Sequence, residues 1–233
     1  MKLGIMQPYF MPYIGYWQRI KAVDKHVIYD DVNYIKNGWM NHNRILLNGE
    51  VRYFNVPLQG ASPNKLINEV GVNNNPVLQG KMLKTLEQAY KKSPYVNEAL
   101  ECLEPIITNT STNLAEYLEF EIRHICRYLG IETELVMSSS LQKDNSLRAQ
   151  DKVIEICKIT GADEYYNASS GEELYSRDAF AAEGLKLTFI RDRGSVVYQQ
   201  RSKEFIPALS IIDVMMNCSK EELNALLDDY ELS

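Results

Sequence analysis

The chain has 233 residues, enough for one or two domains and for a core that buries roughly 70% of the unfolded surface. Lysine and arginine number 25 against 31 acidic residues, and the net charge of −6 disfavours general nucleic-acid binding. Apolar residues make up 45% and charged residues 24%, which excludes a mainly disordered chain.

Membrane and metal signals are weak. No apolar run approaches the ~20 residues of a membrane helix, and residues 1–6 are too short for a signal-peptide core, so we expect a cytoplasmic protein without membrane insertion. The four cysteines lie far apart on mostly apolar stretches, without zinc spacing. We expect them to be reduced core residues and assign no metal ligand.

The first 31 residues predict a βαβ unit. Lys2 to Met6 is a strand, Tyr13 to Val23 a helix, and His26 to Asp31 a second strand. The apolar side chains that give the helix a buried face are Ile14, Trp17 and Ile20. The two strands should pair in parallel through a right-handed crossover.

The middle of the chain predicts a hairpin and helices. Asn48-Gly49 between two apolar runs is typical of a type I′ turn. A loop carrying a strand near residues 66–72 follows, and then helices are expected over 76–92, 95–108 and 114–129. We interpret residues 44–130 as an insertion, forming a small lobe on a single α/β domain that spans 1–233.

Alternation of strands and helices returns after residue 130. Strands are predicted at 134–137, 164–168 and 185–190, with helices at 147–160 and 172–182 between them. An apolar segment at 209–216 and a capping box at Ser219 complete the chain. Five strands in this pattern predict a Rossmann-like, three-layer open parallel sheet.

A tyrosine-rich segment follows the first strand, at the sheet edge where ligands of such folds bind. Tyrosines suit a pocket for a polar ring, although the edge of an amphipathic core would use them too. A glycine at the helix start lets a phosphate approach the backbone N–H groups, as ATP would require. The candidate substrate-binding residues here are Gln7, Tyr9, Tyr13, Gly15 and Tyr16.

The segment from Tyr29 to Arg44 is the strongest candidate site, because acid, base, amide and aromatic groups share sixteen residues. Asp30 or Asp31 could deprotonate an amine or hold Mg²⁺, and His42 could shuttle a proton. As structural alternatives, the charged residues could cap helices or form ion pairs, and His42 could be a hydrogen-bonded loop residue. The remaining candidates are Asn43 as a catalytic residue, and Lys36, Trp39, Asn41 and Arg44 as substrate-binding residues.

Three later segments also follow strands. Ser138 to Ser140 and Asn167 to Gly171 offer hydroxyl and N–H groups for an anion, and we add Asn167 to the substrate-binding candidates. After the fifth strand, Arg191 to Gly194 begins a basic stretch that continues to Arg201 and Lys203. It could face a diphosphate or simply be solvated.

Several strings resemble the WbqC-like proteins of bacterial surface-polysaccharide gene clusters. They are Ile5 to Phe10, Pro12 to Tyr16, Val27 to Val32, Gly38-Trp39, Asn43 to Ile45, Asn64 to Ile67, Leu174-Tyr175 and Phe205 to Asp213. The resemblance spans the chain. It implies a role in O-antigen synthesis, with transfer of glycine to the amine of a nucleotide-linked amino sugar.

Two other functions remain open at this stage. One is a nucleotidyl or glycosyl transferase that acts on a sugar nucleotide. The other is a non-catalytic protein that binds a sugar nucleotide within an assembly complex. The sequence does not fix a cofactor, with ATP and Mg²⁺ as the candidates, and it leaves oligomerisation and the glycyl donor open.

Overall fold

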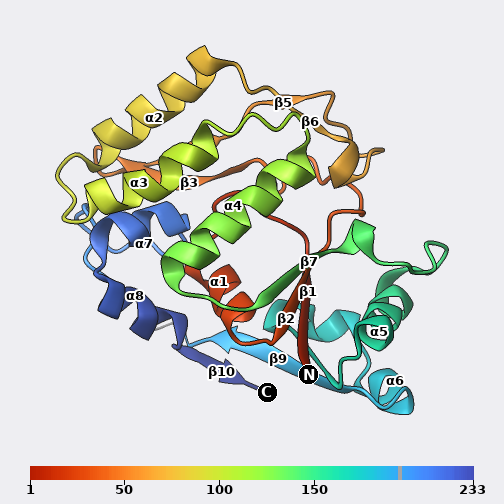
Figure 1. The fold of residues 1–233 in the computed structure, drawn as a ribbon. Helices are drawn as coiled ribbons and strands as arrows, with labels where there is room; N and C mark the ends of the chain where they lie inside the picture. Colours follow the sequence, from red (N-terminus) through yellow and green to blue (C-terminus); the bar gives the residue numbers. More distant parts are fainter. Residues whose placement is uncertain (194–195) are drawn as a thin grey trace.

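A computed structural model describes residues 1–193 and 196–233. Its centre is a six-stranded sheet in the order β10-β9-β8-β1-β2-β7, in which only β10 runs antiparallel to its neighbour (Figure 1). The strands in that order are Tyr230–Leu232, Lys186–Asp192, Glu164–Ala168, Lys2–Met6, Lys25–Ile28 and Glu134–Met137. A mostly parallel α/β sheet is therefore confirmed.

The predicted strands of the central sheet agree closely with the structure, with two corrections. β2 ends at Ile28 and not at Asp31, because the polar residues after Ile28 turn away into a loop. The sheet also has a sixth, antiparallel strand, β10, which the sequence did not predict. Only three residues form it, and it is held by pairing with β9 and not by an apolar pattern of its own.

Helices cover both faces of the sheet, so the three-layer arrangement is confirmed. On one face, Leu3, Ile5 and Val27 pack against α5 and α6. On the other face, Met6 and Ile28 join the core formed with α1, α4, α7 and α8. This division follows from strand geometry, in which successive side chains point to opposite faces. The helices are α1 Ile14–Lys21, α4 Leu114–Leu129, α5 Ala149–Thr160, α6 Arg177–Ala182, α7 Ile211–Asn217 and α8 Lys220–Leu227.

The segment between β2 and β7 adds a hairpin and three helices to the same core as α1. The hairpin turns at Asn48 and Gly49, whose φ values of 55° and 80° are those of the predicted type I′ turn. The elements are β3 His42–Leu47, β4 Glu50–Asn55, β5 Leu58–Gln59, β6 Gly71–Val72, α2 Pro76–Tyr90, α3 Val96–Ile107 and α4. The strand predicted near 66–72 is mostly a 3₁₀ turn, Ile67–Glu69, followed by the short β6. The helix predicted at 172–182 is a 3₁₀ turn, Ser169–Leu174, and then α6.

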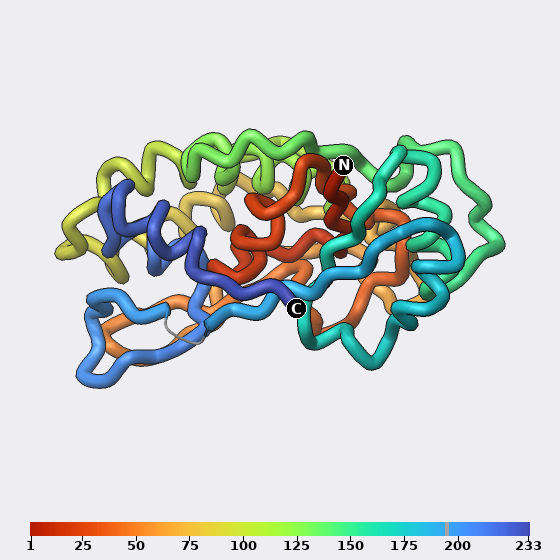
Figure 2. Tube along the Cα trace, turned by 90° about the horizontal axis from the view of Figure 1, so that it is seen from below, coloured from red at the N-terminus to blue at the C-terminus, as the bar shows by residue number. Residues whose placement is uncertain are grey.

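The chain order places a topological switch point between β1 and β8. From β1 the chain moves to β2 and β7 on one side, and later to β8 and β9 on the other. The loops that leave β1 and β8 therefore diverge and open a crevice at the carboxyl edge, the usual ligand position in open α/β sheets. The long segment after β9 returns beside the hairpin, as Figure 2 shows, and Ser210 N–H donates to the Arg44 carbonyl at 2.9 Å.

Two further predictions concern the whole chain. All four cysteines are free thiols, as expected. No helix in the described ranges 1–193 and 196–233 has the length and apolar character needed to cross a membrane.

Candidate functional site

A cavity of about 330 Å³ lies at the switch point and is lined from four parts of the chain. We call it the arginine cavity. Met6, Tyr9 and Tyr13 come from β1 and its loop, and Arg19 comes from α1. The other described lining residues are Pro12, Trp39, Asn43, Arg44, Ala168, Ser170 and Ala208.

Hydrogen bonds hold the loops after β1 and β2 together at this cavity. The Phe10 N–H donates to the Trp39 carbonyl at 2.8 Å, and Asn43 Nδ2 donates to the Phe10 carbonyl at 3.1 Å. Asn43 Oδ1 also accepts the Arg44 N–H at 2.9 Å. Through these bonds the side-chain amide of Asn43, which is 4% exposed, joins the hairpin to the tyrosine-rich turn.

Two residues beside the cavity have strained backbones. Met11 has φ 44° and Ala208 has φ 54°, although neither is glycine. Met11 is held from two sides, because its N–H donates to Glu121 Oε1 at 2.6 Å and its carbonyl accepts the Ser210 hydroxyl at 2.7 Å. Such strain concentrates at functional sites, where the surrounding structure fixes it.

Tyr13 and Gly15 form one unit at the start of α1. A Cβ on Gly15 would lie 2.4 Å from Cε2 of the Tyr13 ring, so only glycine lets the ring lie there. From the sequence, we predicted that Gly15 leaves room for a phosphate to approach the backbone N–H groups of the helix. In the structure it is the Tyr13 ring that occupies the space.

Arg19 reaches the cavity from α1 and lies among tyrosines. Its guanidinium is 5.8 Å from the ring centres of Tyr13 and Tyr16, and Nη1 donates to the Tyr13 hydroxyl at 3.3 Å. Burial raises the pKa of Tyr9, although the Arg19 charge opposes the shift, so Tyr9 stays a neutral phenol. Burial, together with the same charge, lowers the pKa of His26 to about 3.

Arg44 reaches the cavity from β3. Its Nη2 donates to the carbonyls of Pro207 and Ala208 at 3.2 and 2.9 Å, and the guanidinium lies 6.0 Å from the Trp39 ring centre. These contacts orient the group without neutralising it. Trp39 is 40% exposed and forms the rim of the cavity.

Both guanidinium groups keep an unused donor. The Nε atoms of Arg19 and Arg44 are buried and have no hydrogen-bond partner in the described structure. No carboxylate of residues 1–193 or 196–233 lies within 4.0 Å of either group. A cavity with two unpaired arginines favours an anionic ligand, because guanidinium binds carboxylate and phosphate with paired N–H donors.

Asp30 and Asp31 lie outside the described lining of the arginine cavity. Asp30 is 1% exposed, and its Oδ1 accepts the Ser139 N–H at 2.9 Å. Asp31 Oδ2 lies 2.7 Å from Lys143 Nζ and 3.9 Å from Lys152 Nζ. Burial by itself would raise the pKa of Asp31, but the lysine hydrogen bond and charges outweigh it and lower the pKa.

This placement gives both carboxylates structural partners, Ser139 for Asp30 and two lysines for Asp31, and their general-base role stays a prediction. Asp31 Oδ1 has no hydrogen-bond partner in the described structure, but the ammonium groups of Lys143 and Lys152 lie beside Oδ2 and would repel a divalent cation, so this pair of carboxylates does not fit a magnesium site. Residues 1–193 and 196–233 also hold no group of three or more His, Cys, Asp and Glu side chains suited to a metal.

Lys36, Asn41 and His42 line a separate cavity of about 420 Å³, together with Tyr34 and Pro63. Trp39 lines the arginine cavity and His42 does not, although the centres of their two rings are 5.5 Å apart. Burial lowers the pKa of His42 and leaves the ring neutral at pH 7.

The other candidates have mainly structural positions. Tyr16 is 1% exposed and donates to the Gln7 carbonyl at 3.2 Å, inside the core. Asn167 Oδ1 accepts the Ala168 N–H at 2.8 Å, beside the cavity wall. The basic stretch is divided: Arg191 pairs with Glu172, and Arg193 with Asp229 and Glu231. Gly194 lies outside the described residues.

Sequence reasoning missed Arg19, Ser170 and Ala208. Arg19 follows Gly15 by four residues, and positions i and i+4 share one face of a helix, so the predicted helix contained this signal. Ser170 lay within a segment already singled out, but nothing local separated it from its neighbours. Ala208 comes from a segment that only the tertiary fold brings back.

Fold and site together define an α/β protein with a cavity lined by two arginines at the carboxyl edge of its sheet. The model of the WbqC-like protein family matches residues 7–225, and the chain belongs to this family. It is also 28% identical over 222 residues to the uncharacterized protein Rv1507c of Mycobacterium tuberculosis, covering 94% of this chain and 95% of that one. No solved structure matches the chain, so the Rossmann-like assignment stays a prediction.

Proposed function

We propose that the arginine cavity binds a nucleotide-linked amino sugar and that the protein transfers glycine to its amine in surface-polysaccharide synthesis. The observation that carries the binding step is the pair of guanidinium groups, Arg19 and Arg44, in one cavity that no carboxylate of the described residues lines. They would hold the two phosphates. Tyr9, Tyr13 and Trp39 supply flat rings for a sugar or base.

The transfer step follows from the chemistry of such a substrate. The sugar amine attacks the carbonyl carbon of an activated glycyl donor, a C–N bond forms, and the bond to the donor's leaving group breaks. The amine proton leaves with that group or passes to solvent. The described lining of the cavity offers hydroxyl and amide groups but no carboxylate or imidazole. The chain would therefore act by orienting the two reactants.

The pair Arg19 and Arg44 in one cavity also favours one alternative, a protein that binds the sugar nucleotide without catalysis. The other function considered from the sequence is a nucleotidyl or glycosyl transferase with Asp30 and Asp31 on a metal ion. It receives less support, because Ser139 and Lys143 hold these two carboxylates.

Calorimetry with UDP- and dTDP-linked amino sugars tests the binding step. Arg44→Gln should weaken binding about 10- to 100-fold, since hydrogen bonds to charged groups contribute about 1.5–3 kcal/mol. Arg52→Gln is the matched control, because Arg52 lies on the neighbouring strand β4 and pairs with Glu50 away from the cavity. Equal affinities for all three proteins would refute the phosphate role of Arg44.

Mass spectrometry tests the transfer step. The purified protein is incubated with the sugar nucleotide that binds and with glycyl adenylate, glycyl thioester or glycyl-tRNA. A glycylated sugar that is lost with Arg44→Gln supports the transferase. Binding without product from any donor supports the non-catalytic alternative.

A further inference from the structure

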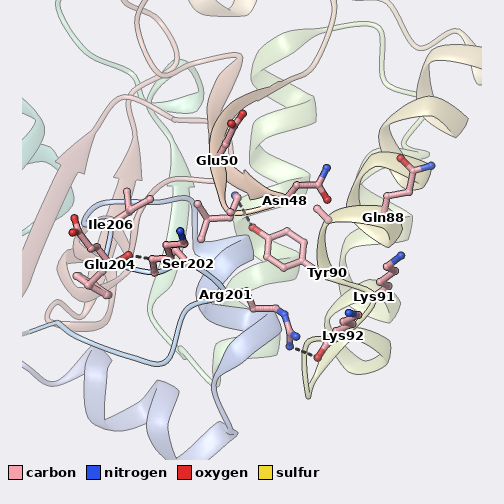
Figure 3. A pocket seen from close by; sticks show the side chains of 15 residues that line it. Asn48, Glu50, Gln88, Tyr90, Lys91, Lys92, Arg201, Ser202, Glu204 and Ile206 are labelled. Carbon is pink, nitrogen blue, oxygen red and sulfur yellow. Dashed lines mark hydrogen bonds between the residues drawn. The ribbon is translucent and has the colours of Figure 1, made fainter.

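A second and larger cavity lies apart from the arginine cavity. It measures about 1040 Å³ and lies between the β3–β4 turn, the end of α2 and the loop 201–206 (Figure 3). We call it the basic groove. It shares none of its described lining residues with the arginine cavity. Figure 3 shows Asn48 and Glu50 on the turn, Gln88, Lys91 and Lys92 at α2, and Ser202, Glu204 and Ile206 on the loop.

Hydrogen bonds fix the walls of the groove. Gln200 is 5% exposed and closes the loop on itself, because its Oε1 accepts the Ile206 N–H at 2.8 Å and its Nε2 donates to the Ile206 carbonyl at 2.9 Å. Arg201 Nη1 donates to the Lys92 carbonyl and joins the loop to α2 (Figure 3). At the floor, the Tyr90 hydroxyl accepts the Leu46 N–H at 3.3 Å. The groove is therefore formed before any ligand arrives.

Positive charge collects around this groove although the chain as a whole is acidic. Lys91, Lys92, Arg201 and Lys203 line it, against Glu50 and Glu204. Glu50 pairs with Arg52, which is not part of the described lining. None of the three lysines lies within 4.0 Å of a carboxylate in the described parts of the chain. Neighbouring cations without counter-charges repel one another, and an anion between them removes that repulsion.

The floor and walls indicate the class of anion. The apolar groups of Leu46, Ala89 and Phe205 line the groove beside the cations. Asn48 and Gln88 add amide donors. Lysine binds phosphate as a point charge, and the volume is at the upper end of the range for small-molecule sites. We propose that the basic groove binds a small organic molecule that carries two or more phosphate groups.

A lysine-modification experiment with inorganic tripolyphosphate tests where such a ligand binds. The full chain is acetylated with and without tripolyphosphate, and each lysine is read by mass spectrometry. At ten times its Kd, the probe should slow acetylation of Lys91, Lys92 and Lys203 about tenfold by mass action. Lys81 and Lys84, exposed on the earlier turns of α2, are the internal controls and should react at an unchanged rate. Uniform or absent protection would overturn the proposal.

Matched variants test the contribution of the groove lysines to affinity. The double variant Lys91→Gln, Lys203→Gln should weaken tripolyphosphate binding at least about tenfold in calorimetry, while Lys81→Gln, Lys84→Gln removes the same charge without effect. If both double variants weakened tripolyphosphate binding equally, the effect would come from overall charge, and the proposed site would be wrong. Equal protection by citrate would overturn the assignment to phosphate. Arg44→Gln should leave the groove protection unchanged, so failure of the arginine cavity and failure of the groove are distinguishable.

Discussion

Glu121 on α4 supports the strained turn beside the arginine cavity. Its side chain is fully buried, Oε1 accepts the Met11 N–H at 2.6 Å, and Oε2 has no partner in the described structure. Burial raises the pKa of Glu121 well above its usual range, and the bond from Met11 opposes the shift only in part. We therefore predict that Glu121→Gln changes the pH dependence of stability.

The sign follows from proton linkage. With a raised pKa in the folded state, the native protein keeps a proton that the unfolded chain has released above about pH 4.3. The free energy of unfolding therefore falls as pH rises, by up to about 1.4 kcal/mol per pH unit, until the folded pKa is passed. Glutamine has no such proton. The free energy of unfolding of Glu121→Gln minus that of the wild type should therefore rise with pH, by up to about 1.4 kcal/mol per pH unit.

Urea unfolding at pH 5, 6, 7 and 8 measures the difference. Glu87→Gln, at an exposed position on α2, is the control and should follow the wild type within about 0.5 kcal/mol. A difference between Glu121→Gln and wild type that stays constant from pH 5 to 8 would refute the reasoning. Glu121→Ala, which leaves the Met11 N–H unpaired, should cost about 1–3 kcal/mol from that donor alone.

Two further substitutions test other parts of the structure. Asp31→Asn leaves Lys143 and Lys152 buried without a carboxylate and should cost about 3–5 kcal/mol in urea unfolding at pH 7. Because the pKa of Asp31 is lowered in the fold, this difference should shrink as pH falls below about 4; a pH-independent difference would contradict it. Gly15→Ala displaces the Tyr13 ring. Stability should change by less than about 1 kcal/mol, since alanine favours the helix, while calorimetry should show weaker sugar-nucleotide binding; unchanged affinity would contradict the role of Tyr13.

The elements that the sequence predicted best depend on local physics. The strands β1, β7 and β8 and the helix α4 begin and end where predicted, because apolar periodicity and capping residues act within one segment. The Asn48-Gly49 turn follows from the positive φ of two residues. β10 escaped prediction because three residues at the chain end form a strand only through pairing with β9.

In the candidate site, too, local sequence predicted some features, and contacts between distant segments decided others. Parallel strands place their following loops at one edge of a sheet, so the sequence could predict that the Tyr9–Tyr13 turn and the stretch near Arg44 meet, and hydrogen bonds from Phe10 and Asn43 join them. It could not tell which charges stay unpaired. Asp31 meets Lys143, more than a hundred residues later, and no local pattern predicts this ion pair.

The sequence by itself therefore determined the five parallel strands, the hairpin and the edge at which ligands should bind, because these depend on short-range periodicity and on one rule of strand direction. The tertiary structure alone decided that Arg19 joins Arg44 in a cavity that no carboxylate of the described residues lines. The pairing of charges depends on contacts between distant segments, and no local pattern encodes it.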